Sequence, residues 1–386
     1  MKLGIFVILI GVLAIFMGLS FVEPEVIEPE LSQVEVLDMP EIDDKETKDE
    51  VIEVVEVVEE PKVEIIEEQA QEPLVVEKEM EIIADVPAVE VVEEPEVVEV
   101  PPISFSTINE VTREALVNVF CTTKSGGSFK PTTGSGVIID ERGVILTNAH
   151  VAQYYLLEDY IVEDFVSCVI RTGSPAKPLY IAKPIFISPS WINTNANNII
   201  QQEPKGTGED DYALLLITER TDSTKTIPET FPFVSPLYNS GNITTGDNVL
   251  LAGYPAGFLS GIVISKSLYI SSAVTQIMEL FTFKEGTLDL FSIGGSVVAQ
   301  QGSSGGAVVN DQNELLGIIV TSTVADTTGD RDLRAITIAH INRSFMKDTG
   351  FDLQTLLSGD IQAEADAFNE NIAPILTQAL VNELDK

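Results

Sequence analysis

The chain has 386 residues and a formal net charge of −39, from 22 basic and 61 acidic residues. A charge this negative repels nucleic-acid phosphates and anionic lipid headgroups, so neither is an expected partner. The charge is also uneven, because residues 23–100 hold 29 acidic residues and only four lysines. The segments of the chain therefore differ in kind.

The N-terminus carries an apolar run. Residues 3–22 are uncharged, and about 20 such residues are enough to cross a bilayer as a helix. Lys2 before the run favours a cytoplasmic N-terminus and an extracytoplasmic remainder. We expect residues 1–22 to be an uncleaved transmembrane anchor. Gly18 and Ser20 could serve as the small residues of a cleavage site, so the alternative is a signal peptide that is cleaved near Ser20, followed by secretion.

Residues 23–102 form a low-complexity tract of Glu, Val, Ile and Pro that contains neither Gly nor an aromatic residue. Charge repulsion and scattered prolines favour an extended, disordered acidic stalk over a packed domain. Calcium capture by the carboxylates is the functional alternative, although the tract shows no ordered ligand loop.

From residue 103 the composition becomes globular. The spacing of Thr107 and Glu110 is that of a capping box and predicts a short helix through Ala115, followed by a strand at 116–121. Short β-branched runs between turn residues predict further strands at 136–139, 143–147, 166–170, 213–217, 248–252, 261–265, 307–309 and 315–321. Many short strands without long helices between them indicate a mainly β, antiparallel barrel or sandwich.

The last part of the chain changes period from about residue 342. Helices are predicted at 351–357 and 361–384. The apolar residues of the second helix approximate one face, and they are Ile372, Ile375, Leu376, Leu380 and Leu384. We expect this face to pack against the β domain, with self-association as the alternative.

Three fragments carry side chains suited to nucleophilic catalysis. His150 ends the run Leu146-Thr147-Asn148-Ala149-His150, Asp211 begins Asp211-Tyr212-Ala213, and Ser304 lies within Gly302-Ser303-Ser304-Gly305-Gly306. A serine hydroxyl needs a base such as imidazole, and the imidazole needs a carboxylate to hold its tautomer. The chain has only two histidines, so such a catalyst must use His150 or His340, and His340 lacks a comparable context. The order His, Asp, Ser agrees with the chymotrypsin arrangement.

Together with Gly134-Ser135-Gly136 and Gly253-Tyr254-Pro255, these fragments resemble the trypsin-like serine peptidases, and especially their HtrA/Deg branch, over about residues 105–345. The resemblance implies a peptidase domain at 103–345, built as two six-stranded antiparallel β-barrels that divide at about 225–245, and a helical tail at 346–386. It further implies a serine endopeptidase that works through an acyl-enzyme on protein or peptide substrates. His150 would be the base, Asp211 its orienting carboxylate and Ser304 the nucleophile, with the N–H groups of Gly302 and Ser304 as the oxyanion hole. No metal or organic cofactor is implied.

The sequence also departs from this family. Ser303 stands where the family has Asp or Asn, and Ala307 where it has Pro. Asp210 lies one residue too early to be the triad carboxylate. Only about 45 residues follow His340, so we expect no PDZ domain after the barrels. These departures motivate an alternative reading, a catalytically weak barrel presented on the stalk as a binding module. Labelling of Ser304 by a fluorophosphonate separates the two readings.

The resemblance also places the substrate pocket and the cysteines. Val298, Thr321 and Ser322 would frame the primary specificity pocket. No acidic residue lies at its base, so we expect a small or medium apolar residue before the scissile bond rather than Lys or Arg. Cys121 and Cys168 fall on strands that can be neighbours in the first barrel. The two cysteines could therefore form a disulfide outside the cytoplasm, or they could be two buried free thiols.

Overall fold

The computed structural model describes residues 103–124, 131–201, 206–241, 243–284, 286–323, 325 and 327–386. The predicted anchor at 1–22 and the predicted stalk at 23–102 lie outside these residues. Within the described ranges, no helix has both the length and the apolar character needed to span a bilayer.

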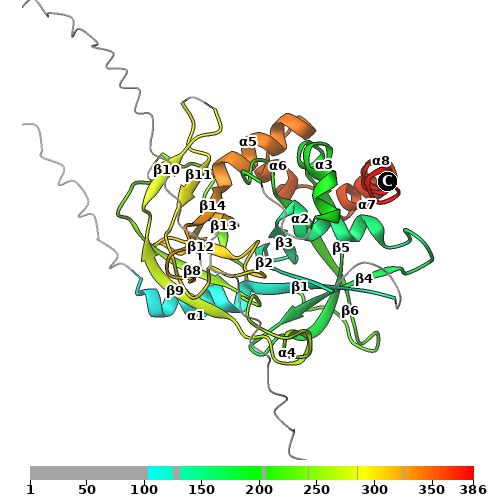
Figure 1. The fold of residues 1–386 in the computed structure, drawn as a ribbon, viewed down its shortest axis with the longest axis horizontal. Coiled ribbons are helices and arrows are strands. Elements are labelled where there is room, and N and C mark those ends of the chain that lie inside the picture. Colours follow the sequence, from blue (N-terminus) through cyan, green and yellow to red (C-terminus); the bar gives the residue numbers. More distant parts are fainter. Residues whose placement is uncertain are drawn as a thin grey trace, which may run out of the picture. The chain divides into compact units, whose positions relative to one another are not determined.

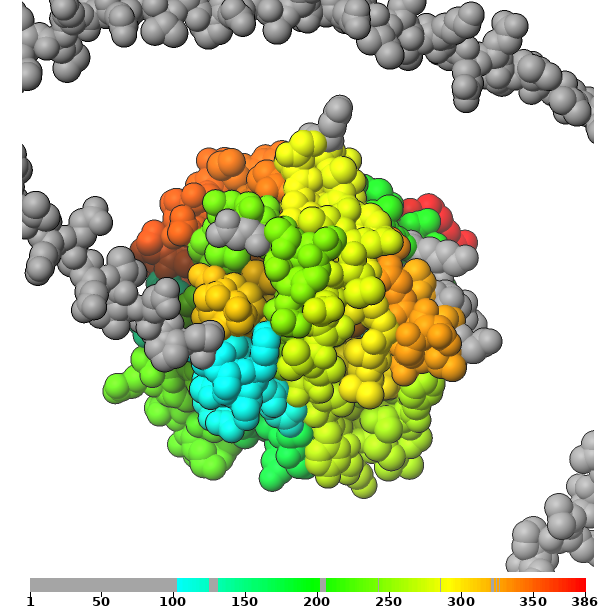
Figure 2. All heavy atoms as spheres, turned by 90° about the vertical axis from the view of Figure 1, so that its left-hand side faces the viewer, coloured from blue at the N-terminus to red at the C-terminus, as the bar shows by residue number. Residues whose placement is uncertain are grey.

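The described chain begins with helix α1 (Phe105–Ala115). Its N-cap is Ser104, whose hydroxyl accepts a hydrogen bond from the Thr107 N–H at 3.3 Å. The predicted helix is therefore confirmed, but it starts earlier than the spacing of Thr107 and Glu110 indicated, because Ser104 already satisfies that N–H group. In the view of Figure 2 the helix (cyan) lies on the surface beside the second β unit, and it packs against strand β8 (Asn248–Gly253).

The first β unit is a closed barrel of six strands, as predicted. Around the barrel the strands follow the order β1 (Leu116–Thr123), β2 (Thr132–Asp140), β3 (Val144–Thr147), β6 (Ala213–Arg220), β5 (Lys177–Ile187) and β4 (Val166–Thr172). Each neighbouring pair is antiparallel. Five of these strands, β1, β2, β3, β4 and β6, match predicted runs, whereas β5 was not predicted.

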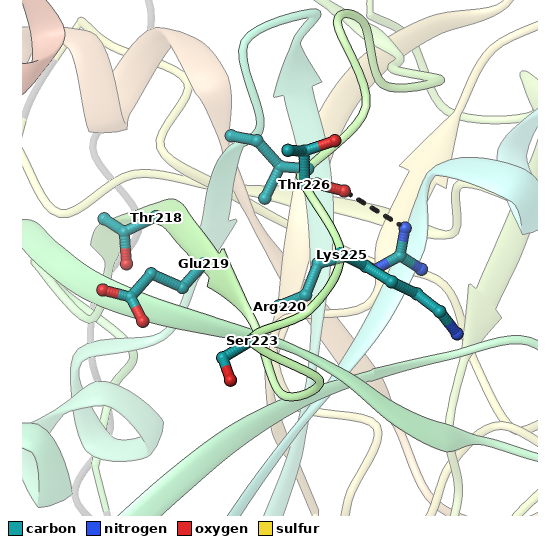
Figure 3. Close-up of a pocket in the computed structure, with 7 residues that line it drawn as sticks. Thr218, Glu219, Arg220, Ser223, Lys225 and Thr226 are labelled. Atoms are coloured by element: carbon teal, nitrogen blue, oxygen red, sulfur yellow. Dashed lines mark hydrogen bonds between the residues drawn. The ribbon is translucent and has the colours of Figure 1, made fainter.

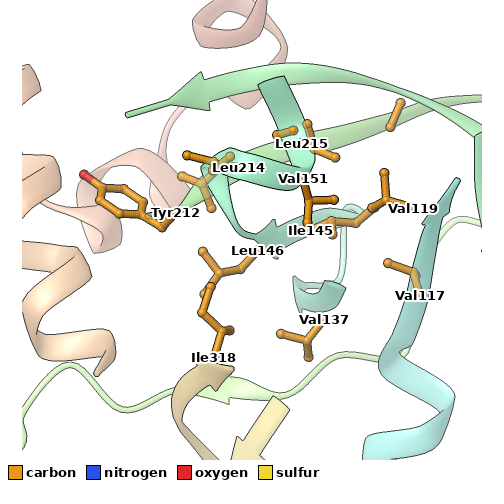
Figure 4. Close-up of a cluster of buried hydrophobic side chains, with 14 of the residues drawn as sticks. Val117, Val119, Val137, Ile145, Leu146, Val151, Tyr212, Leu214, Leu215 and Ile318 are labelled. Carbon is orange, nitrogen blue, oxygen red and sulfur yellow. The ribbon is translucent and has the colours of Figure 1, made fainter. Parts of the chain in front are cut away.

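Fully buried aliphatic side chains fill this barrel. Val117 and Ile145 lie on one face of the sheet formed by β1, β2 and β3, and Val137 and Leu146 lie on the other (Figure 4). All four side chains are completely shielded from solvent. Burying one such side chain stabilises the fold by roughly 1.5–3 kcal/mol. Ile318 of the second β unit lies beside Leu146 (Figure 4), so buried apolar side chains of the two units belong to one cluster.

The second β unit is an open sheet, and the prediction of a second closed six-stranded barrel is wrong. Its strands follow the order β10 (Glu279–Phe281), β11 (Leu290–Ser292), β14 (Leu333–Thr337), β13 (Glu314–Ser322), β12 (Ala307–Val309), β8 and β9 (Ser271–Gln276), and β7 (Ser235–Pro236) pairs with β13. The edges β9 and β10 do not pair. The Ile277 N–H donates to Asp247, which precedes β8, and the Met278 N–H donates to Ser292 of β11. The chain therefore passes directly from the edge strand β9 to the edge strand β10.

The strand predicted at 261–265 is also wrong, because these residues form helix α4 (Gly261–Lys266). None of its residues is buried, and Ile262 is 72% exposed. A β-branched run predicts a strand only where its side chains pack on a pleated surface, and here they have no such neighbours.

Between the strands lie short helical segments. They are α2 (Ala149–Ala152), the 3-10 turn η1 (Gln153–Leu157), α3 (Pro189–Asn195) and the 3-10 turn η2 (Ala196–Ile200). Helix α3 begins at the Ser188 cap, whose hydroxyl accepts from the Trp191 N–H at 3.2 Å. The polar segment 193–201 that follows β5 is thus largely helical.

Four helices end the chain: α5 (Ile338–Thr349), α6 (Leu353–Ser358), α7 (Ile361–Asn371) and α8 (Ala373–Leu384). The single helix predicted at 361–384 is broken at Ile372, because Pro374 lacks an N–H and is accommodated only in the first turn of α8. Helix α7 packs on β5 and α8 packs on α3 and η2, along one side of the first barrel (Figure 1). Leu376 and Leu380 are buried while Ile375 is 66% exposed, so only part of the predicted apolar face packs there.

Candidate active site

His150 and Asp211 form a two-point contact at the edge of the first barrel. The His150 backbone N–H donates to Asp211 Oδ1 at 2.9 Å, and His150 Nδ1 lies 2.7 Å from Asp211 Oδ2. A carboxylate accepts hydrogen bonds, so Nδ1 carries the proton and Nε2 is left with a lone pair. This is the tautomer that a general base needs.

Strand ends fix both residues of this pair. His150 lies in α2, directly after β3, and Asp211 lies directly before β6, the neighbour of β3 in the barrel. Asn148 ties the two segments together, because its side-chain amide donates to the Asp211 carbonyl at 2.8 Å. Register between two adjacent strands therefore brings residues 61 positions apart into contact.

The environment changes the affinity of His150 for protons. Burial of the imidazole lowers its pKa, but the charge of Asp211 and the hydrogen bond to it together outweigh burial, so the pKa of His150 is raised above its usual value. Asp211 is 5% exposed and therefore shielded from competing water.

Ser304 lies in a tight loop before β12. Gly302 and Gly305 have φ angles of +90° and +83°, a region that favours glycine. A Cβ on Gly305 would lie 2.1 Å from the Ser135 carbonyl oxygen, so a side chain is excluded at this position. The Ser135 N–H donates to the Ser304 carbonyl at 2.7 Å, and this bond ties the loop to β2 of the first barrel.

Two backbone donors beside Ser304 are free. In the described part of the chain, neither the Gly302 N–H nor the Ser304 N–H donates a hydrogen bond. Both neighbours, Ser303 and Gly305, do donate, to Gln300 and Ile319. Free paired N–H groups next to a serine are the donors that an oxyanion hole requires.

The link between Ser304 and His150 is open in this structure. Among the described contacts, no hydrogen bond joins Ser304 Oγ to His150 Nε2. Catalytic hydrogen bonds are often long without substrate and shorten when it binds, so this observation does not remove Ser304 from the site.

A third serine, Ser135, joins the two β units behind the site. Its hydroxyl donates to the Gly302 carbonyl at 2.7 Å and accepts from the Tyr254 N–H at 2.8 Å. Ser135 was not among the predicted site residues. Its place within Gly134-Ser135-Gly136, a motif that already carried the family resemblance, was the available signal.

The predicted pocket residues are placed only in part. Val298 is fully buried in the core of the second β unit. Thr321 and Ser322 belong to β13, but their side chains are outside the described atoms. A hollow of about 330 Å³ elsewhere, at the end of β6, contains no predicted site residue (Figure 3). Among the described residues, no three His, Cys, Asp or Glu side chains gather as metal ligands would.

Cys121 and Cys168 lie opposite each other on β1 and β4 and form a disulfide. The bond links β1 to β4, and His150 lies in the stretch of sequence between the two cysteines. The two alternatives left open by the sequence are thereby reduced to one in this structure.

The fold and this site can now be compared with those of known proteins. A family model described as "Trypsin-like peptidase domain" matches residues 134–318, a span that contains His150, Asp211 and Ser304. Residues 134–318 are therefore similar to a trypsin-like peptidase domain, which agrees with the resemblance that the motifs carried.

Two similar solved structures are of "HtrA-type protease AlgW" with tripeptide, one of them of a single-residue variant. Each is 20% identical, with a TM-score of 0.40, over 64% of this chain. The chain covers 65% of the length of these structures. A comparison with the curated proteins found no match.

Proposed function

We propose that this chain is a serine endopeptidase that hydrolyses peptide bonds of protein or peptide substrates through an acyl-enzyme on Ser304. The observation that carries the proposal is the His150–Asp211 pair, which leaves His150 Nε2 free to accept a proton. The family match supports a peptidase, and the free N–H groups of Gly302 and Ser304 support acyl transfer in particular.

The proposed reaction uses these groups in sequence. His150 Nε2 takes the proton of Ser304 Oγ, which attacks the substrate carbonyl carbon. The N–H groups of Gly302 and Ser304 stabilise the oxyanion of the tetrahedral intermediate, worth about 3 kcal/mol per donor in comparable sites. His150 then protonates the leaving amine, and a water activated by the same base releases the acyl group.

Hydrolysis of fluorescein-labelled casein tests this proposal. The wild-type chain should release fluorescent peptides, and Ser304→Ala should lose this activity while remaining folded. Ser303→Ala is the matched control, since it removes the adjacent hydroxyl, and it should retain activity. Equal hydrolysis by wild type and Ser304→Ala would exclude Ser304 as the nucleophile.

We propose that a small or medium apolar residue precedes the scissile bond, since Val298, Thr321 and Ser322 include no acidic group. Cleavage profiling of a peptide library measures this directly, and a strong preference for Arg or Lys would overturn it.

We further propose an extracytoplasmic location with the chain anchored by residues 1–22. The Cys121–Cys168 disulfide supports it, because such bonds persist in oxidising compartments. The mass of the protein extracted from membranes tests the anchor, and a soluble form that begins after Ser20 would favour the cleaved alternative.

A further inference from the structure

The second histidine of the chain lies between two carboxylates next to the triad. His340 is in α5, and its side chain is 10% exposed. Its Nε2 lies 3.3 Å from Asp210 Oδ1, and its Nδ1 lies 3.0 Å from Asp289 Oδ1. A ring protonated at both nitrogens donates to both carboxylates, whereas a neutral ring donates to one. Neither His340 nor Asp210 has a part in the proposed reaction.

Asp210 is held by more than this histidine. Ser344, one helical turn after His340, donates from Oγ to the same Asp210 oxygen at 2.6 Å. Burial raises the pKa of Asp210, but the hydrogen bonds from His340 and Ser344 outweigh it, so the pKa of Asp210 is lowered. Asp210 is therefore anchored to α5 as a carboxylate.

The backbone links Asp210 to the triad. Asp210 has a φ of +58°, an uncommon conformation for a residue other than glycine. The Tyr212 N–H donates to the Asp210 carbonyl at 2.9 Å, which closes a three-residue turn with Asp211 at its centre. The direction of the Asp211 side chain thus depends on how the residues on both sides of it are held.

Helix α5 holds both of those residues. The Tyr212 hydroxyl lies 3.2 Å from Ser344 Oγ, the same oxygen that contacts Asp210. One helix after the last strand of the second β unit therefore contacts the chain immediately before and immediately after Asp211.

Asp289, which contacts Nδ1 of His340, is itself held by further hydrogen bonds. Asp289 also accepts from Arg343 Nη2 at 2.5 Å and from the Phe283 N–H at 2.7 Å. The Phe283 ring meets the imidazole edge-on at 5.0 Å. Among charged neighbours, Lys347 attracts the Asp210 carboxylate, and Asp348 lies on the same helix near Tyr212.

We propose that His340 and Ser344 are positioning residues that hold Asp211 in its contact with His150, acting through Asp210 and Tyr212. The inference rests on the proposed function, because it assigns a role within that triad. It predicts that loosening Asp210 weakens the Asp211 contact, which lowers the raised pKa of His150 and slows attack by Ser304.

The rate of fluorophosphonate labelling of the full-length protein, measured against pH, tests this without a known substrate. For His340→Ala we expect the maximal rate to fall roughly 10- to 100-fold, with unchanged apparent affinity for the reagent. We also expect the acidic limb of the profile to move to lower pH, since His150 would be less supported by Asp211. Ser344→Ala should give the same two changes and is the second variant if His340→Ala folds poorly.

Two conservative variants distinguish the Nε2 contact of His340 with Asp210 from its Nδ1 contact with Asp289. In His340→Gln the amide nitrogen reaches toward the position of Nε2 and Asp210, and it should restore part of the rate. In His340→Asn the amide reaches toward the position of Nδ1 and Asp289, and it should not. Asn342→Ala is the matched control on the same helix, because the Asn342 side chain accepts a hydrogen bond from the Leu353 N–H and, among the described contacts, makes no bond to Asp210.

The outcomes distinguish this inference from the proposal beneath it. No labelling of Ser304 in the wild type would overturn the proposed function, and this inference with it. Wild-type labelling with unshifted limbs in His340→Ala and Ser344→Ala, or equal rates for the Gln and Asn variants, would overturn the positioning role alone.

Discussion

The charge of Asp211 sets the protonation behaviour expected of His150. Because the pKa of His150 is raised, the neutral base is lost as the pH falls, and labelling of Ser304 should decline earlier than for an isolated imidazole. In Asp211→Asn the acidic limb should move to lower pH and the rate should fall on the order of 10⁴-fold. A pH profile of the labelling rate checks both, and an unmoved limb would contradict the assigned partner.

Removal of the Ser303 hydroxyl should stabilise the protein. Its Oγ is buried and, in the described part of the molecule, has no hydrogen-bond partner. An unpaired buried polar group costs about 1–3 kcal/mol, so Ser303→Ala should increase the free energy of unfolding by about 1 kcal/mol. Urea unfolding measures this, and a clear destabilisation would show that the hydroxyl has a partner.

The sequence predicted the triad residues better than it predicted the residues that contact and position them. His150, Asp211 and Ser304 belong to short local motifs, and the structure brings His150 and Asp211 into contact. Asp210 and His340 were given no role, because their contact joins residues 130 positions apart and leaves no local pattern. Val298 was placed by counting from Ser304, which carries no information about which way a side chain points.

Among the elements, the β1–β4 pair carries the disulfide. The bond closes a loop of 47 residues, so reduction should lower the free energy of unfolding by about 2–4 kcal/mol. Unfolding in urea with and without a reductant measures the difference. Cys121→Ser is the matched control, since it should show the loss without a reductant, and a variant as stable as the oxidised wild type would contradict the bond.

Strands were predicted correctly where the segment is buried, and errors occurred where it is partly exposed. Strands β3 and β12, which are buried throughout, gave continuous apolar runs and were found. Strand β5 was missed because its first residues are exposed and because the strand contains two prolines, Pro178 and Pro184. Helix α4 was mistaken for a strand because Ile262, Val263 and Ile264 are β-branched, although nothing packs against them as a sheet would.

On the scale of the whole molecule, Ser135 joins the two β units at the site. Removing its hydroxyl in Ser135→Ala leaves the Tyr254 N–H and the Gly302 carbonyl unpaired in a buried position. We expect a loss of about 1–3 kcal/mol in the free energy of unfolding and slower labelling of Ser304, since Gly302 is displaced. Unchanged values for both would show that the units are held by other contacts.

The overall architecture could be predicted only in outline. The recurrence of short strands indicated an antiparallel β fold, and the family motifs indicated two units. Closure could not be predicted, because it depends on which edges the chain joins at Ile277 and Met278, and backbone hydrogen bonds of that kind have no sequence signature. The packing of α7 and α8 on the first barrel was expected as the simplest outcome, and it is confirmed.

The most direct test of the account is to locate the covalent adduct after fluorophosphonate treatment by tandem mass spectrometry. We expect one adduct, on Ser304, which forms much more slowly in His150→Ala. An adduct on another residue, or a rate at Ser304 that is unaffected by His150→Ala, would contradict it.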